Sequence, residues 1–270
     1  MNLFLKKYFP AKTINQGSTI FTSMDINTLI LFLLAAYLSE VAGTLAGFGS
    51  STLFMPLALF LVDFRIALVM VAVLHISGNL GRLGFFKKGL DYRIIILFGV
   101  PSVILTILGA FLVDYVNQDI LKLSLGLFLI FYVIWSRFRS DFKVPPTRIN
   151  TTLGGGLSGF LAGLIGTGGA LRAAFLTGLG LKKEVYLATA AAIALGVDMT
   201  RLPIYLSQSF LPEELFILIP FLVVTALAGS YTGKKLVSRI SAEGFRKVVL
   251  GALLMMGVYF VLTGSIMLIS

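Results

Sequence analysis

Three arginines and two carboxylates stand inside long apolar stretches of this sequence. Arg82, Arg172 and Arg201 lie in such stretches, and so do Glu40 and Asp198. A charged side chain inside a membrane costs about 2.5 kcal/mol or more, and it generally marks the path of a substrate or an ion. Because this set contains three positive charges and only two negative ones, it favours an anionic ligand.

Two glycine-rich breaks offer a second way to bind an anion. They lie at 47–52 and 166–169, and each precedes a short apolar segment. A helix that begins after a break points its unpaired amides and positive end at the gap, and nearby hydroxyls add donors. The alternative is that the glycines only allow close helix packing in lipid. The candidate substrate-binding residues at the breaks are Gly49, Ser50, Ser51, Thr52, Thr167, Gly168 and Gly169.

Arg172 is the strongest single candidate for substrate binding. It follows Gly169 by three residues, in the first turn of the second short helix, so its charge adds to that of the free amides. The alternative is an ion pair with Glu40.

Further candidates share the face of one predicted helix. His75, Asn79 and Arg82 are spaced i, i+4 and i+7. We expect Arg82 and Arg201 to contact the substrate, unless Arg82 extends to the membrane surface or Arg201 is neutralised by the nearby carboxylate Asp198.

Four of the candidates are expected in ion coupling or gating rather than in substrate binding. A coupling proton has three candidate carriers in the spans, the two carboxylates and the histidine. The alternative for the histidine is a hydrogen bond between helices. The candidates for coupling or gating are Asp198, Glu40, His75 and Asn79.

The composition requires a membrane protein around these residues. The chain is 57% hydrophobic and 13% charged, whereas a soluble domain is about 25% charged. This excludes a disordered chain, a soluble enzyme and a nucleic-acid-binding protein, and it makes the lipid bilayer a partner. The sequence has no cysteine and one histidine, so we expect no disulfide, no metal site and no cofactor.

Ten apolar segments predict an all-α polytopic fold. Two of them, 52–62 and 170–181, are too short to cross a bilayer and are expected to be half-helices, each closing a broken-helix hairpin. The others are expected at 26–46, 65–83, 92–113, 121–137, 151–165, 184–206, 214–233 and 246–269.

The two halves of the chain resemble each other. An offset of 119 residues aligns 47–110 with 166–229 and pairs Arg82 with Arg201 and Pro101 with Pro220. Each half then contains a broken-helix hairpin and three transmembrane helices. We expect transmembrane repeats at 26–138 and 151–270, a basic cytoplasmic linker at 139–150 and an interfacial tail at 1–25.

An odd number of crossings in each half predicts that the repeats are inverted, a common design among secondary transporters. If the loops at 84–93, 137–149, 182–183 and 234–247 face the cytoplasm, they hold 14 of the 22 basic residues. Such a bias is typical of cytoplasmic loops. The expected location is therefore the cytoplasmic (inner) cell membrane, with several crossings.

The glycine breaks also resemble those of a known family. The run from Gly43 through Gly49-Ser50-Ser51 to Pro56, and the run from Gly159 to Gly169, are similar to the motifs of the sulfite exporter TauE/SafE family, also called the toluene sulfonate uptake permeases. The resemblance implies two related halves and transport of sulfite, sulfonates or similar organosulfur anions. The residues at Ser50, Ser51 and Phe175 differ from the family pattern.

The leading hypothesis is a secondary transporter, not an enzyme, that moves a small organosulfur oxyanion by alternating access with a coupling ion such as H⁺. One alternative is an intramembrane enzyme of the phosphatase type acting on a phosphorylated lipid. Another is a passive anion channel.

Overall fold

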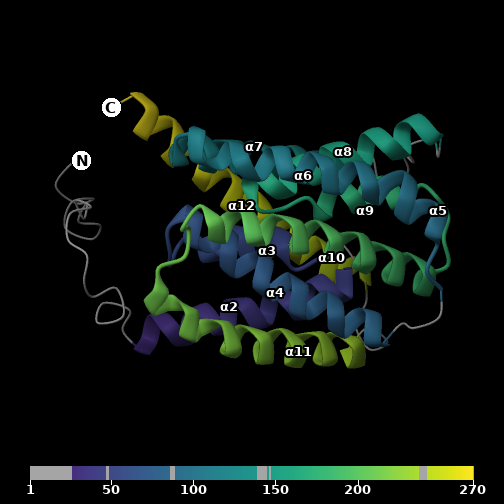
Figure 1. Cartoon of the computed structure of the whole chain (residues 1–270), viewed down its shortest axis with the longest axis horizontal. Coiled ribbons are helices and arrows are strands. Elements are labelled where there is room, and N and C mark those ends of the chain that lie inside the picture. Colours follow the sequence, from purple (N-terminus) through teal and green to yellow (C-terminus); the bar gives the residue numbers. More distant parts are fainter. Residues whose placement is uncertain are drawn as a thin grey trace.

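The computed structural model shown in Figure 1 describes residues 26–46, 49–85, 89–138, 145, 147–236 and 242–269. The predicted interfacial tail at 1–25 and most of the predicted linker at 139–150 lie outside the described residues.

The prediction of an all-α membrane protein is confirmed, and every element in the described part of the chain is a helix. The first half contains α2 (Ile26–Ala46), α3 (Ser51–Ala58), α4 (Phe64–Phe85), α5 (Tyr92–Ile94), η1 (Ile95–Gly99), α6 (Val100–Leu112), η2 (Val113–Tyr115) and α7 (Gln118–Phe138). The second half contains α8 (Arg148–Ile165), α9 (Gly169–Thr177), α10 (Lys183–Ser207), η3 (Glu213–Ile217), α11 (Leu218–Leu236) and α12 (Ala242–Ile269).

Helix lengths separate full spans from half-helices. In the described part of the chain, 7 helices are long and apolar enough to cross a membrane. By contrast, α3 has 8 residues and α9 has 9. At about 1.5 Å per residue they extend roughly 12–14 Å, less than half of a bilayer core. The two short segments expected from the sequence are therefore short helices, and each follows a glycine break.

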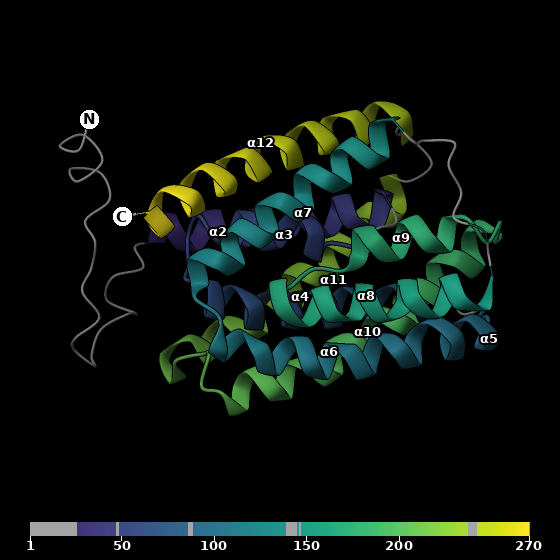
Figure 2. The same cartoon turned by 90° about the horizontal axis from the view of Figure 1, so that it is seen from above.

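Helices at matching positions in the two halves make matching contacts. Helix α2 packs on α11, and its counterpart α8 packs on α6; likewise α4 contacts α11 as α10 contacts α6. Helices α7 and α12 pair with each other along one side of the bundle (Figure 2). These pairings support the predicted repeat, whereas the inversion of the halves stays a prediction.

Glycines and hydroxyls allow α6 and α8 to approach closely. Ser102 donates to the carbonyl of Gly155 at 2.7 Å, and Thr106 donates to the carbonyl of Gly159 at 2.9 Å. A side chain at Gly159 would collide with the backbone of Ser102. The glycines of α8 therefore serve close helix packing.

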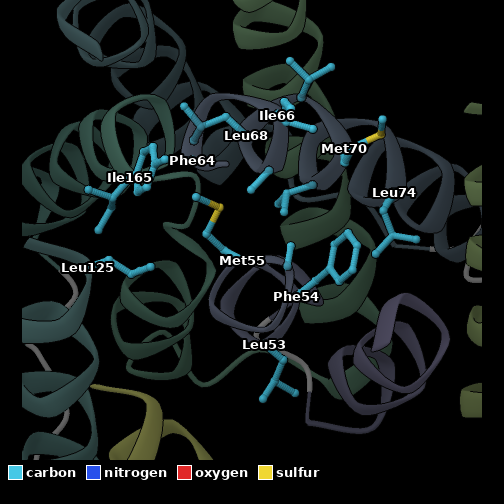
Figure 3. Packing of buried hydrophobic residues seen from close by; sticks show 14 of the residues in the cluster. Leu53, Phe54, Met55, Phe64, Ile66, Leu68, Met70, Leu74, Leu125 and Ile165 are labelled. Atoms are coloured by element: carbon cyan, nitrogen blue, oxygen red, sulfur yellow. The ribbon is translucent and has the colours of Figure 1, made fainter. Parts of the chain in front are cut away.

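A tightly packed apolar core closes one side of the two breaks. Helix α3 is buried almost throughout, and in Figure 3 its Met55 extends toward Leu68 of α4, whereas its Phe54 lies near Leu74. The backbone of Gly166 ends α8 with a φ of 77°, and a side chain there would press on Met55 and Leu68. The core thus requires glycine at the turn that leads into α9.

Candidate functional site

The two glycine breaks meet inside the bundle. Thr52, in the first turn of α3, and Thr167, just before α9, are both buried, and their hydroxyl oxygens lie 3.0 Å apart. Gly49 has a φ of 90°, a conformation that favours glycine. The structure therefore brings together two segments that are 115 positions apart in the sequence.

A small cavity of about 20 Å³ lies beside the first break. Its position is toward the end of the bundle where α4 finishes and α10 starts, the end that carries α5 in Figure 1. The loop before α5 contacts this part of α10, since the amide of Asp91 donates to Thr189 at 3.0 Å. The residues that line the cavity are Gly43, Gly49, Asn79, Arg82, Arg172, Leu187, Ala190 and Ala191.

Arg172 is the exceptional residue of this cavity. Its side chain is only 5% exposed, yet it has no ion pair and no hydrogen bond with any of the described residues. The alternative that Arg172 pairs with Glu40 is wrong, because Glu40 pairs with Arg82. A buried, unpaired guanidinium is costly unless a ligand supplies the missing negative charge.

Arg82 also lines the cavity, but its charge is already compensated. Its guanidinium donates to Glu40 of α2, to Asn79 at 2.6 Å and to Thr44 at 3.3 Å. Ser230 of α11 donates to the same carboxylate at 2.8 Å. Arg82 is 5% exposed, so the alternative that it extends to the membrane surface is wrong.

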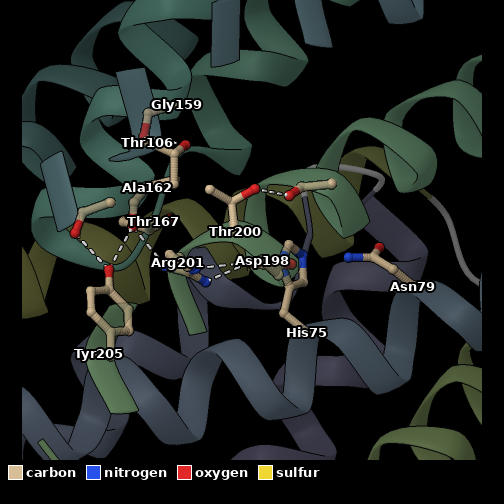
Figure 4. Close-up of polar contacts among 12 residues, drawn as sticks. His75, Asn79, Thr106, Gly159, Ala162, Thr167, Asp198, Thr200, Arg201 and Tyr205 are labelled. Atoms are coloured by element: carbon tan, nitrogen blue, oxygen red, sulfur yellow. Dashed lines mark hydrogen bonds and ion pairs between the residues drawn. The ribbon is translucent and has the colours of Figure 1, made fainter. Parts of the chain in front are cut away.

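Every guanidinium nitrogen of Arg201 has a partner, and the residue lies away from the cavity lining (Figure 4). It contacts Asp198 through Nε at 2.9 Å and Nη2 at 2.7 Å, and its Nη1 donates to the carbonyl of Ala162 at 2.7 Å. The hydroxyl of Tyr205 donates to the neighbouring carbonyl of Gly163 at 2.5 Å. The expected alternative for Arg201, neutralisation by Asp198, is what the structure shows.

Residues 31–260, which include both breaks and every residue of the cavity, match the family model described as "Sulfite exporter TauE/SafE". The chain belongs to this family. The family resemblance expected from the glycine breaks is thereby confirmed. Searches among curated proteins and among solved structures gave no match.

The family and the fold together establish a multi-pass membrane transporter. The match covers both halves of the TauE/SafE chain and includes the cavity and the cluster around Arg201.

Several predicted site residues of this TauE/SafE protein lie next to the cavity rather than on it. Ser50 directly precedes α3, and Ser51 and Thr52 lie in its first turn; all three are buried, and the hydroxyl of Ser50 has no partner among the described residues. Gly168 serves packing, because Ser158 donates to its carbonyl at 2.8 Å and a side chain there would collide with Ser158. Gly169 is buried at the start of α9.

The sequence argument missed the small residues that make room for the cavity. Ala190 and Ala191 lie on α10 in a run rich in alanine, from 188 to 194, which indicates a helix with little side-chain volume. Ser230 was also missed, and a serine within an apolar span is the signal that could have identified it.

Proposed function

We propose that this protein is a secondary transporter that moves a small organosulfur oxyanion, such as sulfite or a sulfonate, across the cytoplasmic membrane. The single observation that carries the proposal is the unpaired guanidinium of Arg172 at the cavity. The family description supplies the chemical class of the substrate.

The charges around the cavity fit one negative group. Glu40 compensates Arg82, and Asp198 compensates Arg201, so of these three buried arginines only Arg172 has no ion pair with a described residue. A guanidinium presents two parallel N–H donors that match two oxygens of a sulfite or sulfonate group. Asn79 and the backbone at Gly49 line the same space and offer further donors.

The cavity is narrow, which supports a transport cycle with an occluded stage. A volume of about 20 Å³ is close to that of one water molecule, so an oxyanion requires the walls to move apart. The contact between Thr52 and Thr167 and the core around Met55 close the opposite side. Alternating access would open the cavity side and the core side in turn.

Replacing Arg172 by alanine tests the assignment. Transport of radiolabelled sulfite or sulfoacetate into proteoliposomes is expected to fall at least about 30-fold, since a buried charge-assisted contact contributes about 2–5 kcal/mol. Arg93→Ala is the matched control, because Arg93 is exposed in α5 and lies outside the cavity lining. Equal transport by Arg172→Ala and by the control would contradict the site.

A thermal-shift panel tests the substrate class separately. Sulfite, thiosulfate, sulfoacetate, taurine, sulfate and phosphate are compared on the wild type and on Arg172→Ala. A ligand that binds the folded state raises the melting temperature. We expect organosulfur anions to stabilise the wild type and to lose this effect in the variant. Stabilisation by phosphate alone would contradict the proposed class.

A further inference from the structure

His75 is the only histidine of the chain, and it lies beside the cavity with one ring nitrogen unused. Its Nδ1 lies 2.8 Å from Oδ2 of Asp198, and the side chain is 3% exposed. The two atoms lie within ion-pair distance without the geometry of a regular hydrogen bond, and the adjacent carboxylate favours a ring proton on Nδ1. The other nitrogen, Nε2, is buried and has no hydrogen-bond partner among the described residues.

Nε2 points at the first glycine break. A Cβ atom built on Gly49 would lie 2.8 Å from Nε2 of His75 and 3.6 Å from Nη2 of Arg172. The imidazole and the unpaired guanidinium therefore approach the same point, and Gly49 itself lines the cavity. Only glycine leaves the space through which these two groups face each other.

We propose that His75 carries the coupling proton of this transporter, by taking up a proton on Nε2 when an anion enters the cavity. The inference rests on the proposed function and selects one of the three groups that the sequence offered for coupling. The proton comes from water on the side where the anion enters and leaves to water on the other side with the anion.

The charges that face His75 explain why proton and anion would bind together. Asp198 of α10 faces Nδ1, Arg172 of α9 approaches Nε2, and Arg82 stands two turns along α4. With the cavity empty, a proton on Nε2 would place a second uncompensated positive charge beside Arg172. An anion removes that repulsion, so each ligand raises the affinity for the other by the same factor.

The two carboxylates are less suited to this task. Asp198 is held by two contacts with Arg201 in addition to the imidazole. Glu40 accepts from Arg82 and from Ser230 with the same oxygen, its other oxygen has no partner among the described residues, and the carboxylate packs against Gly78. Neither carboxylate directs an open position toward Gly49, whereas Nε2 does.

The single histidine allows a direct test on the wild-type protein. The chain is purified without a histidine tag, labelled with ¹⁵N-histidine and placed in nanodiscs. Imidazole ¹⁵N shifts then distinguish the neutral form with a proton on Nδ1 from the doubly protonated ring. The probe is sulfoacetate, thiosulfate or sulfate, all fully ionised between about pH 6 and about pH 8, because their acid groups titrate well below that range.

We expect the neutral ring without anion at about pH 7, and the doubly protonated ring when the binding anion is added at constant pH. We also expect the affinity for the anion to rise about tenfold between about pH 8 and about pH 6, within the usual range of coupling between sites. In His75→Gln this pH dependence should disappear.

The outcomes separate this inference from the proposed function. An anion that binds while the His75 signals stay unchanged would overturn the proton assignment and leave the anion site intact. If the pH dependence of the anion affinity persists in His75→Gln but disappears in Glu40→Gln, the proton is carried by Glu40 and the assignment to His75 is overturned. If none of the three anions binds and sulfite does not bind either, both proposals fail.

Discussion

Arg172 and Arg201 are both buried arginines of the second half, but their surroundings are opposite. Arg201 has two contacts to Asp198 and one to the carbonyl of Ala162, whereas Arg172 has no polar partner among the described residues and borders a cavity. Burial alone does not distinguish the two arginines, since Arg201 is 1% exposed and Arg172 is 5% exposed. What separates a structural arginine from one available to a ligand is whether its donors are already used.

The repeat sharpens the comparison, because Arg82 is the counterpart of Arg201. Each arginine contacts the residue three positions before it, Asn79 in one half and Asp198 in the other. The contact between the arginine and the residue three positions before it is thus repeated, whereas the charge of that partner residue is not. In the first half the counter-charge comes from Glu40 on another helix, which leaves a neutral amide at the cavity. A carboxylate at that position would oppose an anion.

The largest expected effect concerns the stability of the two arginine sites. Arg201→Leu leaves the carboxylate of Asp198 without its cation, and breaking a buried ion pair costs about 3–5 kcal/mol. Arg172→Leu removes an unpaired charge, so the protein should be as stable as the wild type or more so, although transport is lost. Thermal unfolding and the yield of monodisperse protein measure both effects. A similar loss of stability in the two variants would break the comparison.

The next prediction gives the cavity a carboxylate at the position that corresponds to Asp198 in the second half. Asn79→Asp places a carboxylate in the cavity, where it cancels the excess positive charge and repels an anion. We expect the affinity for the transported anion to fall about 10- to 100-fold, equivalent to about 1.4–2.7 kcal/mol, with the protein still folded. Calorimetric titration measures the change. Asn150→Asp is the control, since it adds the same charge at the start of α8, and an equal loss there would point to a nonspecific effect.

The sequence was sufficient to predict the helices and the breaks between them. Apolar length and glycine position identify full spans and half-helices, and the chemistry at the second break made Arg172 the leading candidate for the site. Pairing between helices was not predictable in the same way. The sequence offered Glu40 as a partner for Arg172, and the structure pairs Glu40 with Arg82. That choice depends on the rotation of α2 against α4 and α11, which no local pattern encodes.

The roles of the two repeat-related arginines were also beyond the sequence. Arg82 and Arg201 occupy equivalent positions in the predicted repeat, and the sequence predicted substrate contact for both. The structure places Arg82 on the cavity and Arg201 away from it. The cavity exists because the residues at several lining positions have little or no side chain. These are alanines of α10 and the glycines Gly43 and Gly49.

The smallest expected effect concerns the contact that joins the two breaks. Thr52→Val and Thr167→Val each remove one hydroxyl of the buried pair and keep the side-chain shape. Each single variant should lose about 1–3 kcal/mol, because it leaves the other hydroxyl without its partner, whereas the double variant should recover part of that loss. Melting temperatures of the four proteins form a double-mutant cycle. A coupling near zero would mean that the hydroxyls do not hold the breaks together, and the closed side would then depend on the apolar core around Met55 alone.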